Sequence, residues 1–325
     1  MLFQNVSKLV KYADFSPYLA YEHTLLAASE SLHIPALADR VYGRIQRLVY
    51  SWVQREFRSL LTNWMEEEES AIPFDRPSKA PIWVCWLQGE SQMPTMLRRL
   101  VCNMKRLQGD HQLRLIDYRG VKALDLLPVE VIDQYEAGSI SPAFLSDIIR
   151  VALLERYGGL WMDATVLQTS PIPEEVFKVP FWSVKNLNGS FPYSRRVPYA
   201  LQWQSYFLAS APHALFVRAM KSFLLEYVHR YSTLIDYYLI FYFAHFLLSE
   251  VPILRKEYEN LQANNQLCEL LDPFLMHERS MSHLDVSTFQ NTETIIYKLS
   301  RHHQYPPGTV STIRQLIQTN TDHCR

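Results

Sequence analysis

The segment from Ser146 to Val166 (SDIIRVALLERYGGLWMDATV) gathers side chains whose types and spacing could do chemistry. Asp147 and Arg150 stand three positions apart in a helix-like stretch, so their side chains share one face of that helix. Asp163 follows in a short apolar stretch that is typical of a strand. Two carboxylates and a guanidinium suit a ligand that offers hydroxyl groups to the carboxylates and negative charge to the cation.

The helix that must carry the first two of these residues has recognisable ends. Ser141 and Pro142 are typical of an N-cap followed by proline in the first helical turn. Gly158 and Gly159 are typical of a helix stop, since glycine tolerates the left-handed conformation that often ends a helix. The sequence therefore predicts a helix that turns sharply into the next element.

That next element, LWMDATVL, is predicted to be a strand. Side chains alternate between the two faces of a strand, so Trp161, Asp163 and Thr165 are expected on one face. Asp163 would then lie near the carboxyl end of the strand, where the ligands of open α/β sheets bind.

The surrounding pattern predicts an α/β fold. Short β-rich stretches at 82–89 and 112–118 flank an amphipathic helix at 94–107, and this order favours a parallel sheet. VPFWSVKN (179–186) predicts another strand, and TETIIYKLSRHH (292–303) predicts a last one running into a polar loop. Between Pro198 and about Leu271 the chain is expected to be mainly helical.

The first 70 residues predict helices, because apolar residues recur there at helical spacing. A proline-rich stretch, IPFDRPSKAP, predicts a linker before the sheet. The helices carry a row of arginines that could contact anionic lipid or membrane-bound assembly proteins: Arg40, Arg44, Arg47, Arg55 and Arg58. The acidic run from Glu66 to Glu69 counters them, and a solvated helix face is the more ordinary interpretation.

Composition narrows the class of protein. The 325 residues are 48% hydrophobic and carry a formal net charge of -1, which fits a globular protein and argues against broad nucleic-acid binding. The N-terminus has no signal-peptide pattern, and the most apolar stretch, Leu234 to Ser249, is shorter than a membrane span. The four cysteines show neither metal-ligand spacing nor a secreted disulfide framework. We therefore expect reduced thiols and a cytoplasmic location, with peripheral contact at the inner face of the membrane as the alternative.

The segment also resembles a known motif. SDxxRxxxLxxxGGxYxDxD is shared by glycosyltransferase family 32 and the glucosylating toxins, and residues 146–165 are similar to it throughout. Within that group the chain looks closest to the capsular polysaccharide synthesis protein family. The W-x-D-A-T-V variant, the PIP that follows at 171–173, the FWSVKN strand and WLQGE near the start of the sheet carry this likeness. The resemblance covers roughly Pro81 to His303.

The resemblance implies a GT-A fold, a Rossmann-like sheet with a nucleotide-diphosphate sugar at its carboxyl edge. It implies that Asp147 contacts ribose or sugar hydroxyls and that Arg150 helps to hold the donor. Asp163 matches the first aspartate of DxD, and Trp161 stands where the family usually has tyrosine. Trp86, at the end of the first predicted strand, could stack on the base. The predicted divisions are a helical extension (1–78), the GT-A domain (79–310) and a tail (311–325).

One departure from the motif matters for metal binding. Thr165 replaces the second aspartate of DxD, and a neutral hydroxyl is a weak ligand for a hard divalent cation. A Mn or Mg ion is still expected from the resemblance, held by Asp163, Thr165 and His303. Alternatively Lys298, with His302 and His303 nearby, could neutralise the diphosphate.

Most of these residues also have ordinary structural interpretations. Asp147 and Arg150 could form a surface helix pair, and Asp163 could cap a turn. Trp86 could belong to the core, and Lys298 to a solvated face. The joint spacing of the motif favours the functional interpretation for the first three residues, because it involves a helix, a turn and a strand together.

The predicted function is transfer of a hexose from a nucleotide-diphosphate sugar, with UDP as the expected carrier, to a glycan or lipid-linked glycan acceptor. The setting would be capsular or exopolysaccharide synthesis, and the resemblance implies a retaining reaction. The alternative is a catalytically inactive scaffold that binds nucleotide-sugar, which Thr165 keeps open. A nucleotide-sugar hydrolase or a toxin-like transferase acting on protein is a third option.

Overall fold

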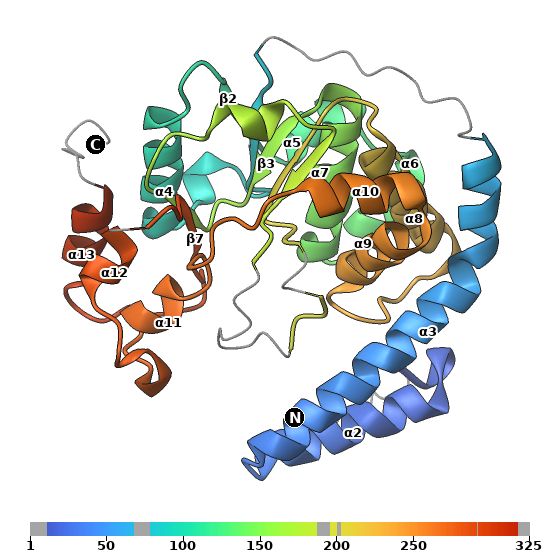
Figure 1. Ribbon diagram of the computed structural model, residues 1–325. Coiled ribbons are helices and arrows are strands. Elements are labelled where there is room, and N and C mark those ends of the chain that lie inside the picture. The colour runs from blue at the N-terminus through green and yellow to red at the C-terminus, as the bar shows by residue number, and fades with distance from the viewer. Residues whose placement is uncertain (1–11, 68–78, 187–195, 200–202, 291, 318–325) are drawn as a thin grey trace.

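A computed structural model describes residues 12–67, 79–186, 196–199, 203–290 and 292–317. Figure 1 shows an α/β body from which a helical hairpin projects. The hairpin consists of α2 (Pro17–Ser31) and the first part of α3 (Pro35–Glu67), so the prediction of N-terminal helices is confirmed. The predicted linker after α3 lies largely outside the described residues.

The body is built on a five-stranded sheet with the strand order β2-β1-β3-β6-β5. Its strands are β1 (Ile82–Cys85), β2 (Leu113–Ile116), β3 (Gly159–Met162), β5 (Phe181–Ser183) and β6 (Phe207–Ser210). β1 pairs in parallel with both β2 and β3, whereas β6 is antiparallel to β3 and β5. The α/β class and the parallel pairs at the start of the sheet are thus confirmed.

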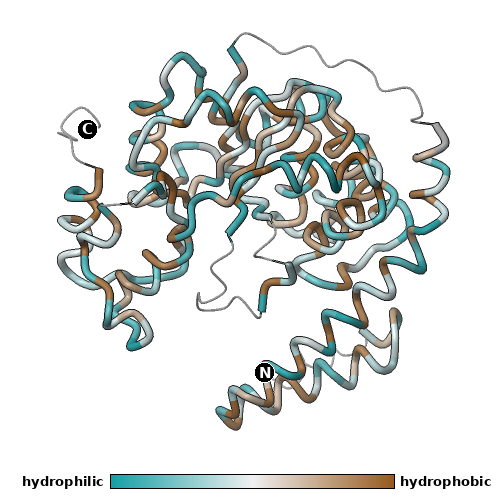
Figure 2. The backbone as a smooth tube through the Cα atoms, in the orientation of Figure 1, coloured by the Kyte–Doolittle hydropathy of each residue, from teal (hydrophilic) through white to brown (hydrophobic). Residues whose placement is uncertain are grey.

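Alternation along the strands divides the core into two layers. On one face Trp83, Trp161 and Leu208 pack with α3 and with helices α7 (Pro142–Tyr157), α8 (Leu215–Arg230) and α9 (Leu239–Glu250). On the other face Ile82 and Leu160 pack with α4 (Thr95–Arg106) and with the C-terminal elements. The tube in Figure 2 is accordingly brown along much of α9 and the central strands, and teal along many connecting loops.

Shorter elements complete the body. The helices are α5 (Tyr118–Ala123), α6 (Val129–Glu136), α10 (Pro252–Asn260), α11 (Leu271–Leu275), α12 (Val286–Gln290) and α13 (Thr309–Ile317). Three 3-10 turns span Glu90–Gln92, Glu174–Phe177 and Arg279–Met281. A second, two-stranded sheet joins β4 (Val166–Gln168) to β7 (Ile296–Lys298), antiparallel. α13 runs across residue 310, where we placed a domain boundary, and that division stays a prediction.

One sequence-based expectation about strands is wrong, and one strand is not predicted by the sequence. The region predicted to be mainly helical contains β6, a four-residue strand buried between β3 and β5. LWMDATVL is not one strand, because β3 ends at Met162 and the chain turns before β4 begins at Val166. The N–H of Val166 donates to the carbonyl of Asp163 at 3.0 Å, which closes this turn. Period-two alternation therefore does not extend to Asp163 and Thr165.

The tight connection between α7 and β3 requires its two glycines. Gly158 and Gly159 have φ values of 63° and 100°, in the region that favours glycine. A Cβ on Gly159 would lie 2.1 Å from the carbonyl oxygen of Pro81, and one on Gly158 would lie 2.5 Å from Cδ of Pro212. The glycines thus let β3 start one residue after the helix ends, directly beside β1.

Several N-terminal arginines are engaged by carboxylates. Arg44 lies 2.7 Å from Glu22, Arg58 lies 2.8 Å from Glu250, and Arg55 lies 3.0 Å from its neighbour Glu56. These pairs reduce the free positive charge of the hairpin, so contact with a membrane or assembly proteins stays a prediction. Within the described ranges, no helix combines the length and the apolarity that a bilayer span needs.

The cysteines differ in state. Cys85 and Cys268 are free thiols, whereas Cys102 is in a disulfide. The expectation of reduced thiols is therefore wrong at Cys102, because spacing along the chain does not show which sulfurs meet in space.

Gly159→Ala is expected to destabilise the protein far more than Gly138→Ala. Both glycines have positive φ, but a Cβ at Gly138 meets nothing within 4 Å. Gly138→Ala should cost about 1 kcal/mol of backbone strain. Gly159→Ala should cost roughly 3 kcal/mol or more, because overpacking against Pro81 adds to that strain. Urea unfolding of the two variants measures the difference, and equal losses would show that the close approach to Pro81 does not matter.

Candidate functional site

A cleft of 570 Å³ opens at the carboxyl ends of β1 and β3. It is lined by the residues after β1, the start of α7, the turn after β3, and segments 204–206, 237–241, 269–273 and 298–303. The cleft lies where a parallel sheet places its ligands, as the sequence predicted for Asp163. Its walls come from elements more than a hundred residues apart in the chain.

Helix α7 delivers Asp147 and Arg150 to this cleft. Its N-terminus is capped by Ser141, whose hydroxyl accepts a hydrogen bond from the N–H of Phe144 at 3.2 Å. The Nη1 of Arg150 donates to Oδ1 of Asp147 at 2.7 Å. Only 5% of the Arg150 side chain is exposed, so this is not a surface ion pair. Burial makes the pairing necessary, since an unpaired buried charge is costly.

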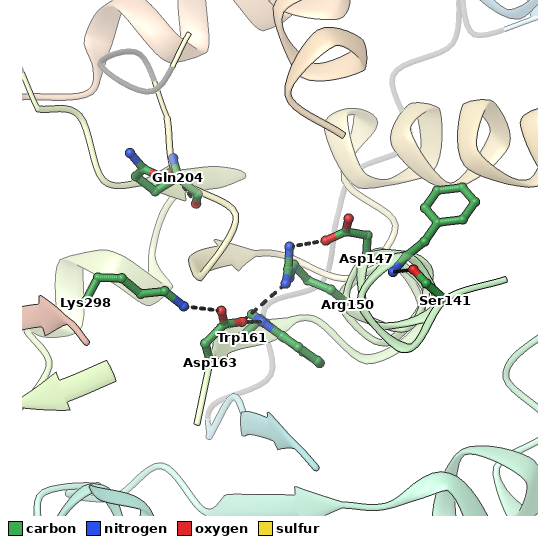
Figure 3. A network of polar contacts seen from close by, with 9 residues as sticks. Ser141, Asp147, Arg150, Trp161, Asp163, Gln204 and Lys298 are labelled. Carbon is green, nitrogen blue, oxygen red and sulfur yellow. Dashed lines mark hydrogen bonds and ion pairs between the residues drawn. The ribbon is translucent and has the colours of Figure 1, made fainter. Parts of the chain in front are cut away.

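Asp163 lies in the turn after β3 and accepts hydrogen bonds from three side chains (Figure 3). Arg150 Nη2 and Trp161 Nε1 donate to Oδ1 at 3.2 and 2.8 Å, and Lys298 Nζ donates to Oδ2 at 2.6 Å. Burial acts to raise the pKa of Asp163, but the charges of Lys298 and Arg150 more than offset it and lower the pKa. Asp163 is therefore an anion throughout the physiological pH range.

Lys298 reaches the site through the β4–β7 ladder. Val166 pairs with Lys298 in that ladder, and the N–H of Leu299 donates to the carbonyl of Thr165 at 3.0 Å. The Lys298 ammonium lies between Asp163 and the hydroxyl of Thr165, which it contacts at 2.7 Å. It also lies 5.0 Å from the centroid of the Tyr206 ring. Three contacts thus hold one cation at the base of the cleft.

Asp147 has a different electrostatic environment from Asp163. Burial raises the pKa of Asp147 to about 6, Arg150 acts to lower it, and the negative charge of Asp163 raises it further. One carboxylate of the site is thus permanently charged, whereas the other changes charge near neutrality. Such a separation between two acids is common at functional sites.

The two tryptophans have different places in the site. Trp161 is 1% exposed, its indole N–H is bound to Asp163, and its ring lies 5.0 Å from the Arg150 guanidinium. It therefore positions charged side chains and offers little surface to a ligand. Trp86 lies on the cleft wall after β1, and its buried Nε1 has no hydrogen-bond partner among the described residues. Trp86 is thus the better platform for an aromatic ligand.

The side chains predicted to hold a metal do not form a good cation site. Asp163 and Thr165 offer one carboxylate and one neutral hydroxyl, and Lys298 contacts both. His303 lies in the same cleft, but its Nδ1 is 2.9 Å from Asp272. In the part of the chain that the structure describes, no three His, Cys, Asp or Glu side chains are grouped to bind a metal. A hard divalent cation at this place would take most of its ligands from water or a ligand's phosphates, and it would compete with the Lys298 ammonium for the two oxygens.

Several cleft residues were not singled out from the sequence: Tyr206, Tyr237, Glu269, Asp272 and Arg301. The hydroxyl of Tyr206 donates to Oε1 of Glu269 at 2.6 Å. Burial raises the pKa of Glu269, while Tyr206 and Lys298 act in the opposite direction. These residues lie in stretches without a local motif. Tyr206 precedes β6, Tyr237 precedes α9, Glu269 and Asp272 lie at the start of α11, and Arg301 follows β7.

Comparison with known proteins identifies the family of the chain. The profile described as capsular polysaccharide synthesis protein matches residues 32–316, most of the chain. This chain belongs to that family. The resemblance inferred from the Ser146–Thr165 motif is thereby confirmed.

No curated protein matches the chain. Among solved structures, one that is similar is the PaToxG glycosyltransferase, at 13% sequence identity. The match covers 84% of this chain and 95% of that chain, with a TM-score of 0.39. At that TM-score the likeness adds no argument, and the family assignment rests on the profile.

Asp147→Asn should change how stability depends on pH. The folded protein holds the Asp147 proton up to about pH 6, against an ordinary pKa of 3.8. The stabilisation from that proton is complete below the ordinary pKa and is lost as the pH rises through about 6. Relative to the asparagine variant, the wild type should therefore lose up to roughly 3 kcal/mol of unfolding free energy across this window. Urea unfolding at a series of pH values measures this, and a constant difference would contradict the raised pKa.

Proposed function

We propose that this protein is a glycosyltransferase of capsular polysaccharide synthesis with a GT-A arrangement of its sheet. The donor is a hexose linked to a nucleoside diphosphate, with UDP as the first candidate, and the acceptor is a glycan. The observation that carries the proposal is the convergence of Asp147, Arg150, Asp163 and Lys298 in one cleft at the carboxyl edge of the sheet.

The charges of the site suit such a donor. A nucleotide-sugar has hydroxyl groups on ribose and hexose, and a carboxylate such as Asp147 can accept their hydrogen bonds. Its diphosphate needs cations, and Lys298 lines the cleft. Trp86, on the same wall as the end of β1, would stack on the base. Membership of the family supports the polysaccharide setting of the reaction.

The proposed reaction is a transfer with retention. The acceptor oxygen forms a bond to the anomeric carbon while the bond from that carbon to the phosphate oxygen breaks. The acceptor proton passes to the departing phosphate, so the protein need not supply a base. Negative charge develops on the diphosphate as it leaves, and fixed cations close to it stabilise the transition state more than the ground state.

Asp163→Ala should abolish hexose transfer, because it leaves Arg150 and Lys298 without the carboxylate that positions them. The loss should reach at least about a hundredfold in turnover, as for other losses of electrostatic positioning. A radiolabelled-sugar transfer assay measures it, preceded by a screen of UDP-hexoses. Asp163→Asn tests the same charge with less change of shape.

The matched control for this test is Asp110→Asn, an exposed aspartate in the turn before β2. It should leave turnover unchanged. Wild-type turnover from a folded Asp163→Ala protein would refute the assignment of the site. UDP binding without turnover of any donor would instead favour the inactive scaffold.

Trp86→Ala should weaken UDP binding by about tenfold to a hundredfold, because base stacking on an aromatic ring contributes roughly 1–3 kcal/mol. Trp86→Phe should retain most of the affinity, since phenylalanine still offers a flat face. Calorimetric titration with UDP measures both variants. Unchanged affinity in Trp86→Ala would place the base elsewhere in the cleft.

A further inference from the structure

We propose that the ammonium of Lys298 permanently takes the place of the divalent cation, so that the donor diphosphate is bound without a metal ion. The inference rests on the proposed function, because it concerns how the same site holds the same donor. It concerns one position in the cleft, the space between Asp163 and Thr165, the two residues at the places of the aspartates in the DxD motif that residues 146–165 resemble.

The contacts of Lys298 coincide with those that a bound cation would make. Its Nζ lies 2.6 Å from Oδ2 of Asp163 and 2.7 Å from Oγ1 of Thr165. These oxygens belong to the two residues at the DxD positions of the motif. A Mg or Mn ion on the same oxygens would lie within about 2.0–2.2 Å of each, in space that the ammonium fills. The two cations cannot share this position.

Both carboxylate oxygens of Asp163 are already engaged by cations or by an indole N–H, and only one lone pair of Oδ2 is left. Oδ1 already accepts from Arg150 and Trp161, and Oδ2 accepts from Lys298. This arrangement accounts for the threonine at position 165. An aspartate there would add a second negative charge beside Asp163, which the single ammonium of Lys298 would not balance. With threonine, Asp147 and Asp163 are matched by Arg150 and Lys298, and the four side chains are neutral together.

Lys298 still has an N–H group available to a ligand. An ammonium has three N–H donors, and Asp163 and Thr165 take two of them. The side chain is 28% exposed and lines the cleft, so the third N–H can donate to a phosphate oxygen. Arg301 follows three residues later on the cleft wall, exposed and without an ion pair among the described residues, and supplies a second cation for the diphosphate.

The ammonium is also held firmly enough to act as a resident cation. Lys298 ends β7, whose pairing with β4 fixes its backbone opposite Val166. The ring of Tyr206 lies 5.0 Å from Nζ and adds a cation–π contact. A cation that is already in position costs little reorganisation when charge develops on the leaving diphosphate.

Calorimetric titration of UDP into the wild-type protein, in excess EDTA and in excess Mn, tests the inference. The dissociation constant should differ by less than about twofold between the two conditions. Lys298→Ala should bind UDP at least about tenfold more weakly in EDTA, because a charge-assisted hydrogen bond to phosphate is lost. The matched control Lys178→Ala, an exposed lysine outside the cleft, should bind like the wild type.

A second variant distinguishes loss of the ammonium from misfolding of the Lys298→Ala protein. Thr165→Asp combined with Lys298→Ala restores two carboxylates and vacates the space between them. This double variant should regain UDP binding in Mn and lose it in EDTA, a gain that structural damage cannot produce.

The outcomes separate the inference from the proposed function. Wild-type binding that requires Mn and disappears in EDTA overturns the inference and leaves the glycosyltransferase assignment intact. Wild-type affinity for UDP in a folded Lys298→Ala protein also overturns it. Absence of binding in both conditions, for UDP and for the other nucleoside diphosphates, contradicts the proposed function and the inference together.

Discussion

The site depends on the hydrogen bonds and ion pairs around the carboxylate of Asp163, whose side chain is only 25% exposed. A buried anion is costly unless donors surround it, and here they come from three elements: Arg150 from α7, Trp161 from β3 and Lys298 from β7. Each hydrogen bond tolerates only a few tenths of an ångström, so together they fix how these elements lie with respect to one another. The glycine turn after α7 and the β4–β7 ladder are the backbone features that allow this meeting.

The same arrangement shifts the pKa values of the two carboxylates in opposite directions: the pKa of Asp163 is lowered and that of Asp147 is raised. Asp163 has two cations and an indole N–H around it, whereas Asp147 has a single cation and the repulsion of Asp163. The negative charge of Asp163, at the base of the cleft, is therefore constant with pH. The charge of Asp147, on α7, changes as the pH passes through about 6. A ligand with hydroxyl groups at one end and phosphates at the other meets different acid–base properties along its length.

Much of this site could be predicted because its centre is local in sequence. Ser141 as cap, the Asp147–Arg150 face and the glycine stop all depend on residues within about one helix, where spacing decides geometry. The turn at Asp163 was missed because a strand and a strand-turn-strand have the same apolar pattern over eight residues. β6 was missed because a strand of four residues just before a long helix gives too weak a signal.

The cleft wall that contains Tyr206 and Glu269 could not be predicted from sequence spacing. Tyr206 and Glu269 meet through tertiary packing, and no local pattern records which residues meet in that way. Lys298 was identified only as one of two sources of positive charge, since its contact with Asp163 spans 135 residues.

That long span has a consequence for how the protein is made. Chains emerge from the ribosome N-terminus first, and α7 and β3 are synthesised long before β7. Until β7 has emerged and paired with β4, Asp163 lacks one of its two cations and the base of the cleft is incomplete. A nascent chain can therefore build the five-stranded sheet while the base of the cleft is still incomplete. The cleft takes its final form only when β7 docks on β4.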